Sequence, residues 1–280
     1  MRVGIIGASG FVGGHLHAAL SARGDDVVTA SLRDPRAAAV AVRDCDGVVN
    51  LAGEPIFQRW STSAKARIRS SRVDATRTLL EALARETRRP QVLVNASAIG
   101  FYPPSDSRTY GEADPHGNDF LGELCCRWEE AAEGATELGM RAAIVRLGIV
   151  LGRDGGALTA MLPAFRLGLG GRIGEGKQWF SWVHVDDAVG ILAMALDGAR
   201  GVFNATAPQP VTNAELTRAL GTVLRRPTLF AVPGFALRLA LGEGAAMLLT
   251  GARVLPQRAL EAGYTFRFTA IDAALRDLLP

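Results

Sequence analysis

The chain has 280 residues, a formal net charge of +3 at neutral pH, and a hydrophobic fraction of 48%. This apolar content is sufficient for a substantial core and excludes a disordered chain, and the length suits one large domain or two small ones. The arginines are scattered, without a basic stripe or aromatic-basic interleaving, so nucleic-acid binding is excluded.

Short apolar runs rich in β-branched residues alternate with helix-like segments through the first half of the chain. The runs predict strands at residues 2–8, 26–33, 46–53, 90–100 and 141–152, and the segments between them predict helices at 13–24, 34–45, 62–87 and 122–139. Continuous apolar strands that alternate with helices predict a doubly wound parallel sheet, an α/β fold of the Rossmann type. We therefore assign residues 1–150 to a dinucleotide-binding domain.

The pattern loosens after Leu151. A glycine-rich stretch with a helical core is followed by a predicted strand at 178–185, a helix at 186–198 and a strand at 201–206. Thr212 followed three residues later by Glu215 predicts a capping box at the start of a helix over 212–226. We expect residues 151–280 to form mainly a smaller substrate or cap region, with about 183–206 returning to the Rossmann domain.

The turn after the first strand, GIIGASGFVGG, places glycines at intervals of three. Gly7 permits a tight turn, Gly10 lets the backbone approach a pyrophosphate, and Gly13 lets the helix pack closely on the strand. The amides at the start of the helix then face the phosphates. The residues expected to hold the pyrophosphate are Gly7, Ser9, Gly10, Phe11, Val12 and Gly13.

The spacing GxxGxxG, together with NLAG at 50–53 and NASAIGFY at 95–102, resembles the short-chain dehydrogenase/reductase superfamily. The later segments RLGIVLG and WVHVDDAV resemble its extended branch, and NLAGEPI, RWEE and LPQRALEAGYTFRF are similar to atypical members described as nucleoside-diphosphate-sugar epimerases. The resemblance implies a dinucleotide across the carboxyl ends of the strands. It would be lined by Leu51, Ala52, Gly53, Ala96, Ser97, Ala98, Leu147, Gly148, Ile149 and Val150.

The end of the second predicted strand bears on the cofactor. An acidic residue there binds the ribose 2′-hydroxyl of NAD, whereas an arginine accommodates the 2′-phosphate of NADP. The strand ends with Arg33, Asp34 follows, and Arg36 lies one turn further. We favour NADP(H) over NAD(H). The alternatives are that Arg33 is an exposed charge without a ligand, or that Asp34 binds the ribose of NAD(H).

The Tyr-x-x-x-Lys pair of the superfamily is missing. Phe120 and Leu124 occupy the expected places, and neither of the two lysines, Lys65 and Lys177, follows a tyrosine by four residues. The remaining catalytic candidates are Ser97, which matches the active-site serine of the superfamily, and Tyr102. Tyr102 would need its pKa lowered by a cation such as Arg146. A serine bonded to backbone and a tyrosine that only lines the pocket are the alternatives.

Further candidates lie in the second half of the chain. Gln178, Trp179 and Trp182 are candidates for a substrate pocket, because aromatic faces suit a sugar ring or a base, with packing at the domain junction as the alternative. His184 has a near-neutral pKa that suits proton transfer. The extended branch uses this segment instead to support the fold, with Asp186 or Asp187 capping a helix.

The three cysteines, Cys45, Cys125 and Cys126, fit neither a disulfide framework nor a metal site, and we expect no metal. Glycines and a histidine interrupt the apolar N-terminus, and Arg238 and Glu243 interrupt the apolar stretch at 232–251, so we expect a soluble, cytoplasmic protein without membrane attachment.

The expected function is that of an NADP(H)-binding oxidoreductase or epimerase of the atypical extended type. Its partner would be a small-molecule substrate, either a nucleotide sugar or another hydroxy or carbonyl compound, and a homodimer is a possible assembly. The alternative is a non-catalytic NADP(H)-binding sensor, which the missing Tyr-x-x-x-Lys pair favours.

Overall fold

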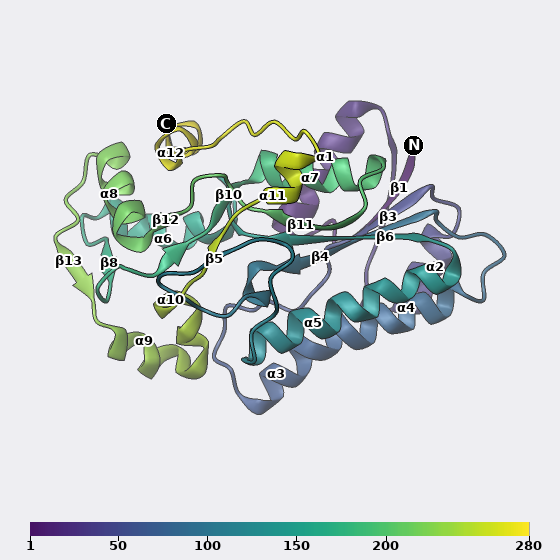
Figure 1. The fold of residues 1–280 in the computed structure, drawn as a ribbon, viewed down its shortest axis with the longest axis horizontal. Coiled ribbons are helices and arrows are strands. Elements are labelled where there is room, and N and C mark those ends of the chain that lie inside the picture. Colours follow the sequence, from purple (N-terminus) through teal and green to yellow (C-terminus); the bar gives the residue numbers. More distant parts are fainter. Residues whose placement is uncertain (280) are drawn as a thin grey trace.

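A six-stranded parallel sheet forms the centre of the protein, which we describe for residues 1–279 from a computed structural model (Figure 1). The strand order is β2-β1-β3-β4-β6-β11, and every neighbouring pair is parallel. The strands are β1 (Arg2–Ile6), β2 (Asp26–Ala30), β3 (Gly47–Asn50), β4 (Val92–Ala98), β6 (Arg141–Leu147) and β11 (Gly201–Ala205). Because the chain runs outward from β1 to β2 and then returns to β3, the strand order reverses at β1, which is where doubly wound folds bind ligands. The predicted fold class is confirmed.

Helices cover both faces of this sheet (Figure 1). One face carries α1 (Phe11–Arg23) and α7 (Val185–Asp197), whose buried residues include Leu16, Val189 and Leu192. The other face carries α2 (Pro35–Val42), α4 (Ala75–Leu83) and α5 (Phe120–Glu133). Burial on both faces explains why the strands read as continuous apolar runs.

Two predicted elements are divided in the structure. The helix expected over 62–87 consists of α3 (Thr62–Arg69), the π-helical segment η1 (Ser70–Asp74) and α4. The strand expected over 141–152 ends at Leu147 and continues as β7 (Ile149–Leu151), which pairs with β10 (Trp182–His184) instead of the large sheet. A β-carbon on Gly148 would lie 2.8 Å from the Ser181 carbonyl oxygen, so the chain changes partners at a residue without a side chain.

The smaller region lies at the left of Figure 1 and contains short strands and helices around a separate core that includes Leu158, Trp182 and Leu275. Residues 1–279 also form four two-stranded sheets: β7 with β10, β9 with β12, β8 with β13, and β5 with β14. The elements not yet described are η2 (Ile99–Phe101), β5 (Thr109–Tyr110), η3 (Gly134–Leu138), α6 (Gly156–Arg166), β8 (Gly171–Ile173), β9 (Trp179–Phe180), β12 (Val211–Thr212), α8 (Asn213–Leu224), β13 (Phe230–Val232), α9 (Gly234–Leu241), η4 (Gly242–Ala245), α10 (Ala246–Leu249), β14 (Arg253–Val254), α11 (Gln257–Glu261) and α12 (Ile271–Leu278).

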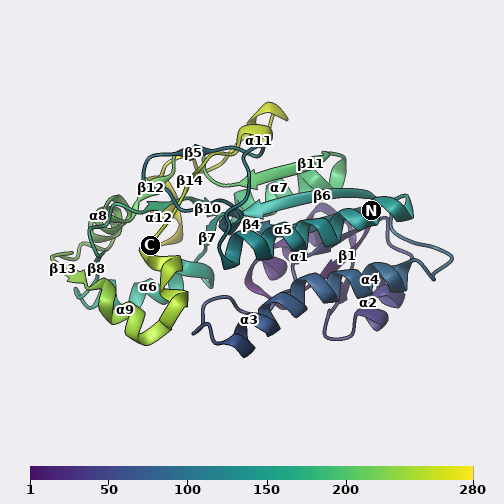
Figure 2. The ribbon, with the colours of Figure 1, turned by 60° about the horizontal axis from the view of Figure 1, so that its bottom comes forward.

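Segments distant in sequence meet above the carboxyl edge of the sheet. Figure 2 shows β5 and β14 near α11, beyond the carboxyl ends of β6 and β11.

The predicted capping box is confirmed, because Thr212 accepts from the Glu215 amide and the Glu215 carboxylate accepts from the Thr212 amide. Within residues 1–279, no helix has both the length and the apolar character needed to cross a bilayer.

Candidate functional site

The glycine turn between β1 and α1 adopts a shape that other residues cannot reproduce. Gly7 has a φ of +92°, and a β-carbon on Gly13 would lie 2.2 Å from the Gly7 carbonyl oxygen, so the helix rests directly on the turn. Gly10 is the N-cap of α1 and no side chain caps the helix. Among the described residues, the amides of Phe11, Val12 and Gly13 therefore have no acceptor. Three free amides at a helix N-terminus can bind an anion such as a diphosphate.

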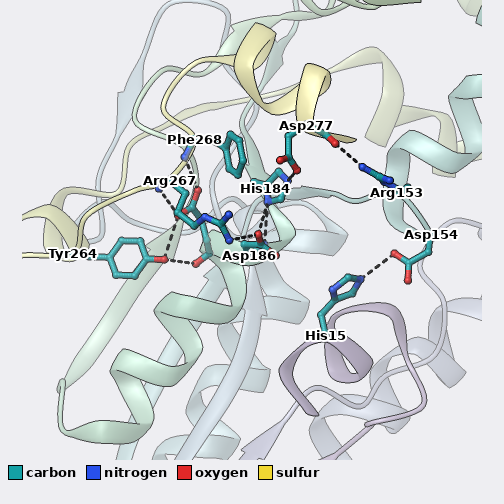
Figure 3. Close-up of polar contacts among 10 residues, drawn as sticks. His15, Arg153, Asp154, His184, Asp186, Tyr264, Arg267, Phe268 and Asp277 are labelled. Atoms are coloured by element: carbon teal, nitrogen blue, oxygen red, sulfur yellow. Dashed lines mark hydrogen bonds and ion pairs between the residues drawn. The ribbon is translucent and has the colours of Figure 1, made fainter. Parts of the chain in front are cut away.

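The ring of Phe11 packs against the loop that follows β7. β-carbons on Gly152 and Gly155 would each lie 2.3 Å from the ring, so the loop after β7 fits over it only because these residues are glycines. His15 meets the ring edge-on, and its Nε2 lies 2.9 Å from the Asp154 carboxylate (Figure 3). Phe11 thus holds the loop over the glycine turn, and its backbone amide is the part that remains for a ligand.

An open depression of about 570 Å³ lies beside the turn, at the end of β2. The residues that line it are Ala8, Ser9, Gly14, His17, Thr29, Ala30 and Ser31. β2 ends at Ala30, three residues earlier than expected, so Arg33 stands on the following loop, where it is exposed. Asp34 is the N-cap of α2 and accepts from the amides of Arg36 and Ala37. One carboxylate oxygen of Asp34, Oδ1, is thus engaged by the helix, while Arg33 has no carboxylate partner within residues 1–279.

The strand ends expected to line the cofactor lie side by side. Leu51 to Gly53 follow β3, Ala96 to Ala98 end β4, and Leu147 ends β6. Gly53 is exposed, whereas Gly148, Ile149 and Val150 turn away with β7. Beneath these ends, the Asn50 amide donates to Asn95 Oδ1 (2.7 Å) and to Thr76 (3.3 Å). Sequence reasoning did not identify this buried support.

A buried polar network occupies the position of the expected catalytic residues. The Ser97 hydroxyl donates to the Glu129 carboxylate (2.5 Å), and Arg146 donates to both oxygens of Glu129 (2.9 and 2.8 Å). Arg146 also donates to the Tyr102 hydroxyl (2.8 Å), which in turn donates to Asn204 (2.8 Å). The sequence analysis did not identify Glu129 and Asn204 as members of the site, because their hydrogen-bond partners are distant in the chain.

This network changes the interpretation of both candidates. The single hydroxyl proton of Ser97 already faces Glu129. Arg146 is the partner of Tyr102, as considered, but burial raises the pKa of Tyr102 to about 12 despite the opposing effect of Arg146. Tyr102 is 2% exposed, so the structure gives it a packing role instead of the role of an acid that faces substrate.

The places of the missing pair are apolar. Phe120 meets Trp60 edge-on with ring centroids 5.1 Å apart, and the Lys65 ammonium lies 5.3 Å from the Phe120 centroid. Leu124 is buried in the same cluster. The next residue, Cys125, is buried against Ser97, and burial raises the pKa of its thiol to about 12, so this thiol is a poor proton carrier at neutral pH.

The three substrate candidates are largely committed to structure. Trp182 is fully buried and its indole donates to the Gln209 carbonyl, which corrects the expectation that its ring lines a pocket. The Gln178 amide donates to the carbonyls of Ile173 and Leu248. Trp179 is half-buried, donates to the Asp106 carbonyl and lies under the Arg253 guanidinium. Of the three, Trp179 keeps the most accessible surface.

His184 is the N-cap of α7, the role expected of Asp186 or Asp187. Its Nδ1 accepts from the Asp186 amide, so Nε2 carries the proton and faces Asp277 of α12 at 3.3 Å (Figure 3). Burial lowers the pKa of His184, and the ring stacks on Phe268. Asp187 accepts from the amides of Arg267 and Phe268. This group therefore fastens the C-terminal segment to the start of α7.

Comparisons with known proteins agree with this architecture. Residues 3–205 match the NAD dependent epimerase/dehydratase family, and residues 232–278 match a domain of unknown function, DUF1731. The Bos taurus epimerase family protein SDR39U1 is 41% identical, with 100% of both chains covered. The crystal structure of human epimerase family protein SDR39U1 (isoform 2) with NADPH has a TM-score of 0.92 at 36% identity and covers 100% of this chain and 99% of that one. A nucleoside-diphosphate sugar epimerase from Corynebacterium glutamicum has a TM-score of 0.80 at 33% identity, over 100% of this chain and 58% of that one. The chain therefore belongs to the NAD-dependent epimerase/dehydratase family.

Proposed function

We propose that this protein binds NADP(H) across the carboxyl ends of β1, β3, β4 and β6. The observation that carries the proposal is the uncapped N-terminus of α1, where three amides lack acceptors among the described residues. These amides would hold the diphosphate, and the strand ends at Leu51 to Gly53, Ala96 to Ala98 and Leu147 would line the rest of the dinucleotide. The human relative at a TM-score of 0.92 was solved with NADPH, which supports the same class of ligand here.

The preference for NADP(H) rests on Arg33 and Asp34. Arg33 lacks a carboxylate partner within the described chain and stands beyond the end of β2, next to the depression at Thr29 to Ser31. An arginine at this place recognises a 2′-phosphate. The NAD alternative requires Asp34 to bind the ribose, and Oδ1 of its carboxylate is already occupied in capping α2.

The bound nicotinamide would supply hydride transfer to or from a carbon that bears a hydroxyl or carbonyl group. We propose an oxidoreductase or epimerase reaction on a nucleotide sugar or another small hydroxy or carbonyl compound. The similarity to the Corynebacterium glutamicum nucleoside-diphosphate sugar epimerase supports that substrate class. Ser97 and Tyr102 are both 2% exposed and bonded to Glu129 and Asn204, so they would support the strand ends beneath the substrate.

A second candidate function is that of an NADP(H) sensor without turnover. The apolar replacement of the usual pair by Phe120 and Leu124, packed against Trp60, favours it, because these side chains can neither give nor take a proton.

Titration of the purified, nucleotide-stripped protein with NADPH and NADH tests cofactor binding. The NADPH complex is then mixed with a panel of nucleotide sugars and small carbonyl compounds while absorbance and product composition are followed. Oxidation of NADPH or an isomerised product would support the enzyme. Tight NADPH binding with no turnover would support the sensor. If neither NADPH nor NADH binds, both the enzyme and the sensor are refuted.

A further inference from the structure

Exposed apolar side chains gather at the tip of the smaller region, on elements that contact one another. β8, β13 and α9 lie together at the left of the molecule, beside α6 (Figures 1 and 2). β8 pairs with β13, and a β-carbon on Gly168 would lie 3.6 Å from Pro227. We call this area the cap surface, and it carries six large apolar residues that are 57–88% exposed: Leu167, Leu169, Leu229, Phe230, Phe235 and Leu239.

The helix α9 shows this exposure most clearly. None of its eight residues, all within the described chain, is buried, and Phe235 and Leu239 lie four positions apart on one side of it. Single apolar residues occur on any protein surface, but a group of them on adjoining elements marks a site of contact with a protein or a membrane. Arg238, which interrupts the apolar stretch at 232–251, is exposed on the same helix.

The cap surface is also strongly basic. The two segments that build most of it, residues 155–174 and 224–242, contain five arginines and no aspartate or glutamate. The acidic residues that follow these segments are already paired, Glu175 with Lys177 and Glu243 with Lys65. All five arginines are exposed, and no carboxylate of residues 1–279 lies within ion-pair distance of them: Arg166, Arg172, Arg225, Arg226 and Arg238. The positive charge of this surface is therefore uncompensated within the described chain.

The combination of apolar and basic residues decides which partner fits. A second copy of the chain would present the same five arginines, so a symmetric contact through this surface would bring like charges together, which is costly. Protein partners are held mainly by tryptophan, tyrosine and arginine in fitted pockets, whereas these two segments contain no tyrosine or tryptophan, and their exposed leucines protrude. Leucine and phenylalanine beside arginine are typical of surfaces that lie in the interface of an anionic bilayer.

We propose that the cap surface docks on an anionic lipid bilayer, with Leu229, Phe235 and Leu239 inserted among the headgroups and the arginines bound to lipid phosphates. Such peripheral attachment requires no helix that crosses the bilayer. It revises the expectation of no membrane attachment, which was drawn from interruptions in the apolar stretches. Arg238 prevents α9 from spanning a bilayer but favours a position at its surface, where the long side chain reaches the phosphates. The inference does not depend on NADP(H) binding.

Vesicle sedimentation with the full chain tests the inference. Wild-type protein should sediment with vesicles of equal parts phosphatidylserine and phosphatidylcholine, stay in solution with phosphatidylcholine alone, and be released by salt. Leu229→Ser/Phe235→Ser should lower the affinity for the mixed vesicles at least tenfold. The matched control is Leu260→Ser, an exposed leucine on α11, which should stay within twofold of wild type.

The arginines are tested in the same assay. Arg225→Gln/Arg226→Gln should also lower the affinity for the mixed vesicles at least tenfold, because two charges leave the surface. Its control is Arg77→Gln/Arg85→Gln, which removes two exposed arginines in and after α4, at the other end of the molecule from α9 in Figure 1, and should stay within twofold of wild type. Melting temperatures show that each variant is folded, since every substituted side chain is exposed.

Hydrogen exchange of the wild-type protein provides a readout that does not depend on a variant's folding. Mixed vesicles should slow the exchange of backbone amides within residues 229–241 at least fivefold and leave those of α4 unchanged. The inference is overturned if wild-type protein stays in solution with mixed vesicles, if it binds phosphatidylcholine alone equally well, or if the folded variants bind as wild type does. A dimer in solution that Leu229→Ser/Phe235→Ser abolishes, without vesicle binding, would assign the surface to a second copy and likewise overturn it.

Discussion

Two adjacent glycines of α1 offer a direct test of how the turn is built. A β-carbon on Gly13 would lie 2.9 Å from Ala8 Cα and only 2.2 Å from the Gly7 carbonyl oxygen, the latter more than an ångström inside ordinary contact distance. A β-carbon on Gly14 would meet nothing closer than the Ala8 carbonyl oxygen at 3.8 Å. Alanine at position 13 must push the helix away from the turn, whereas alanine at position 14 fits in place.

The two substitutions should therefore have opposite effects on stability. Overpacking against backbone costs about 1–3 kcal/mol, which exceeds the gain of roughly 1 kcal/mol in helix propensity, so we expect Gly13→Ala to lower the free energy of unfolding. Gly14→Ala should raise it by about 0.5–1 kcal/mol. At roughly 2–3 °C per kcal/mol for a chain of this size, the melting temperatures of the two variants should lie on opposite sides of the wild-type value.

Thermal unfolding followed by circular dichroism, together with NADPH titration, measures both consequences. Displacing the free amides of α1 should raise the NADPH dissociation constant of Gly13→Ala at least tenfold, a loss of about 1.4 kcal/mol. A Gly13→Ala protein that melts at or above the wild-type temperature and binds NADPH normally would show that the turn does not need the bare α-carbon, and the argument from close contact would fail.

Three further outcomes can be measured. Arg33→Ala should weaken NADPH by about 1.5–3 kcal/mol, the scale of hydrogen bonds to a charged group, while NADH affinity stays unchanged in the same fluorescence titration; equal losses would remove the basis for NADP preference. Arg146→Met should lower the free energy of urea unfolding by about 3–5 kcal/mol, because it leaves Glu129 buried without its cation. The double variant Arg146→Met/Glu129→Gln should recover part of that loss, and no recovery would contradict the pairing. The pKa of His184 is lowered on folding, so the unfolded state binds more protons below about pH 6.5, and the free energy of unfolding should fall as the pH decreases from 7 through the folded pKa. His184→Asn keeps an acceptor for the helix cap and should show a shallower fall. Identical pH profiles of the two proteins would exclude His184 as the cause.

The parts of the fold that sequence predicts well are those whose signal is local. A parallel strand buried on both faces reads as a short apolar run, and β1, β3 and β4 were located on that basis. The glycine spacing likewise reports a steric requirement between near neighbours, as the contact of Gly13 with Gly7 shows. The family resemblance followed from short motifs, several of which lie at the carboxyl ends of β1, β3, β4 and β6.

The roles of the site residues depended on partners that no local pattern specifies. Tyr102 bonds to Arg146 and Asn204, which lie 44 and 102 positions away. An aromatic residue after a glycine-rich loop has the same sequence signature in a core as in a pocket, and Trp182 is in the core. The spacing of apolar residues does not reveal the π-helical segment η1, because one extra residue in a turn moves the apolar face of a helix only slightly. This small shift brings Arg72 to Gly53.

The buried network holds the strand ends of the site without the residues of the usual pair. Glu129 on α5 joins Ser97 of β4 and Arg146 of β6, and Arg146 reaches the Glu112 carbonyl in the loop that follows β5. These bonds fix the carboxyl ends of two strands and the loop above them without a contribution from the first turn of α5. Phe120 and Leu124 pack instead in the apolar cluster that contains Trp60 and Trp128. Ser97 is 2% exposed and gives its proton to Glu129, so its hydroxyl belongs to this buried support instead of a surface that faces a ligand.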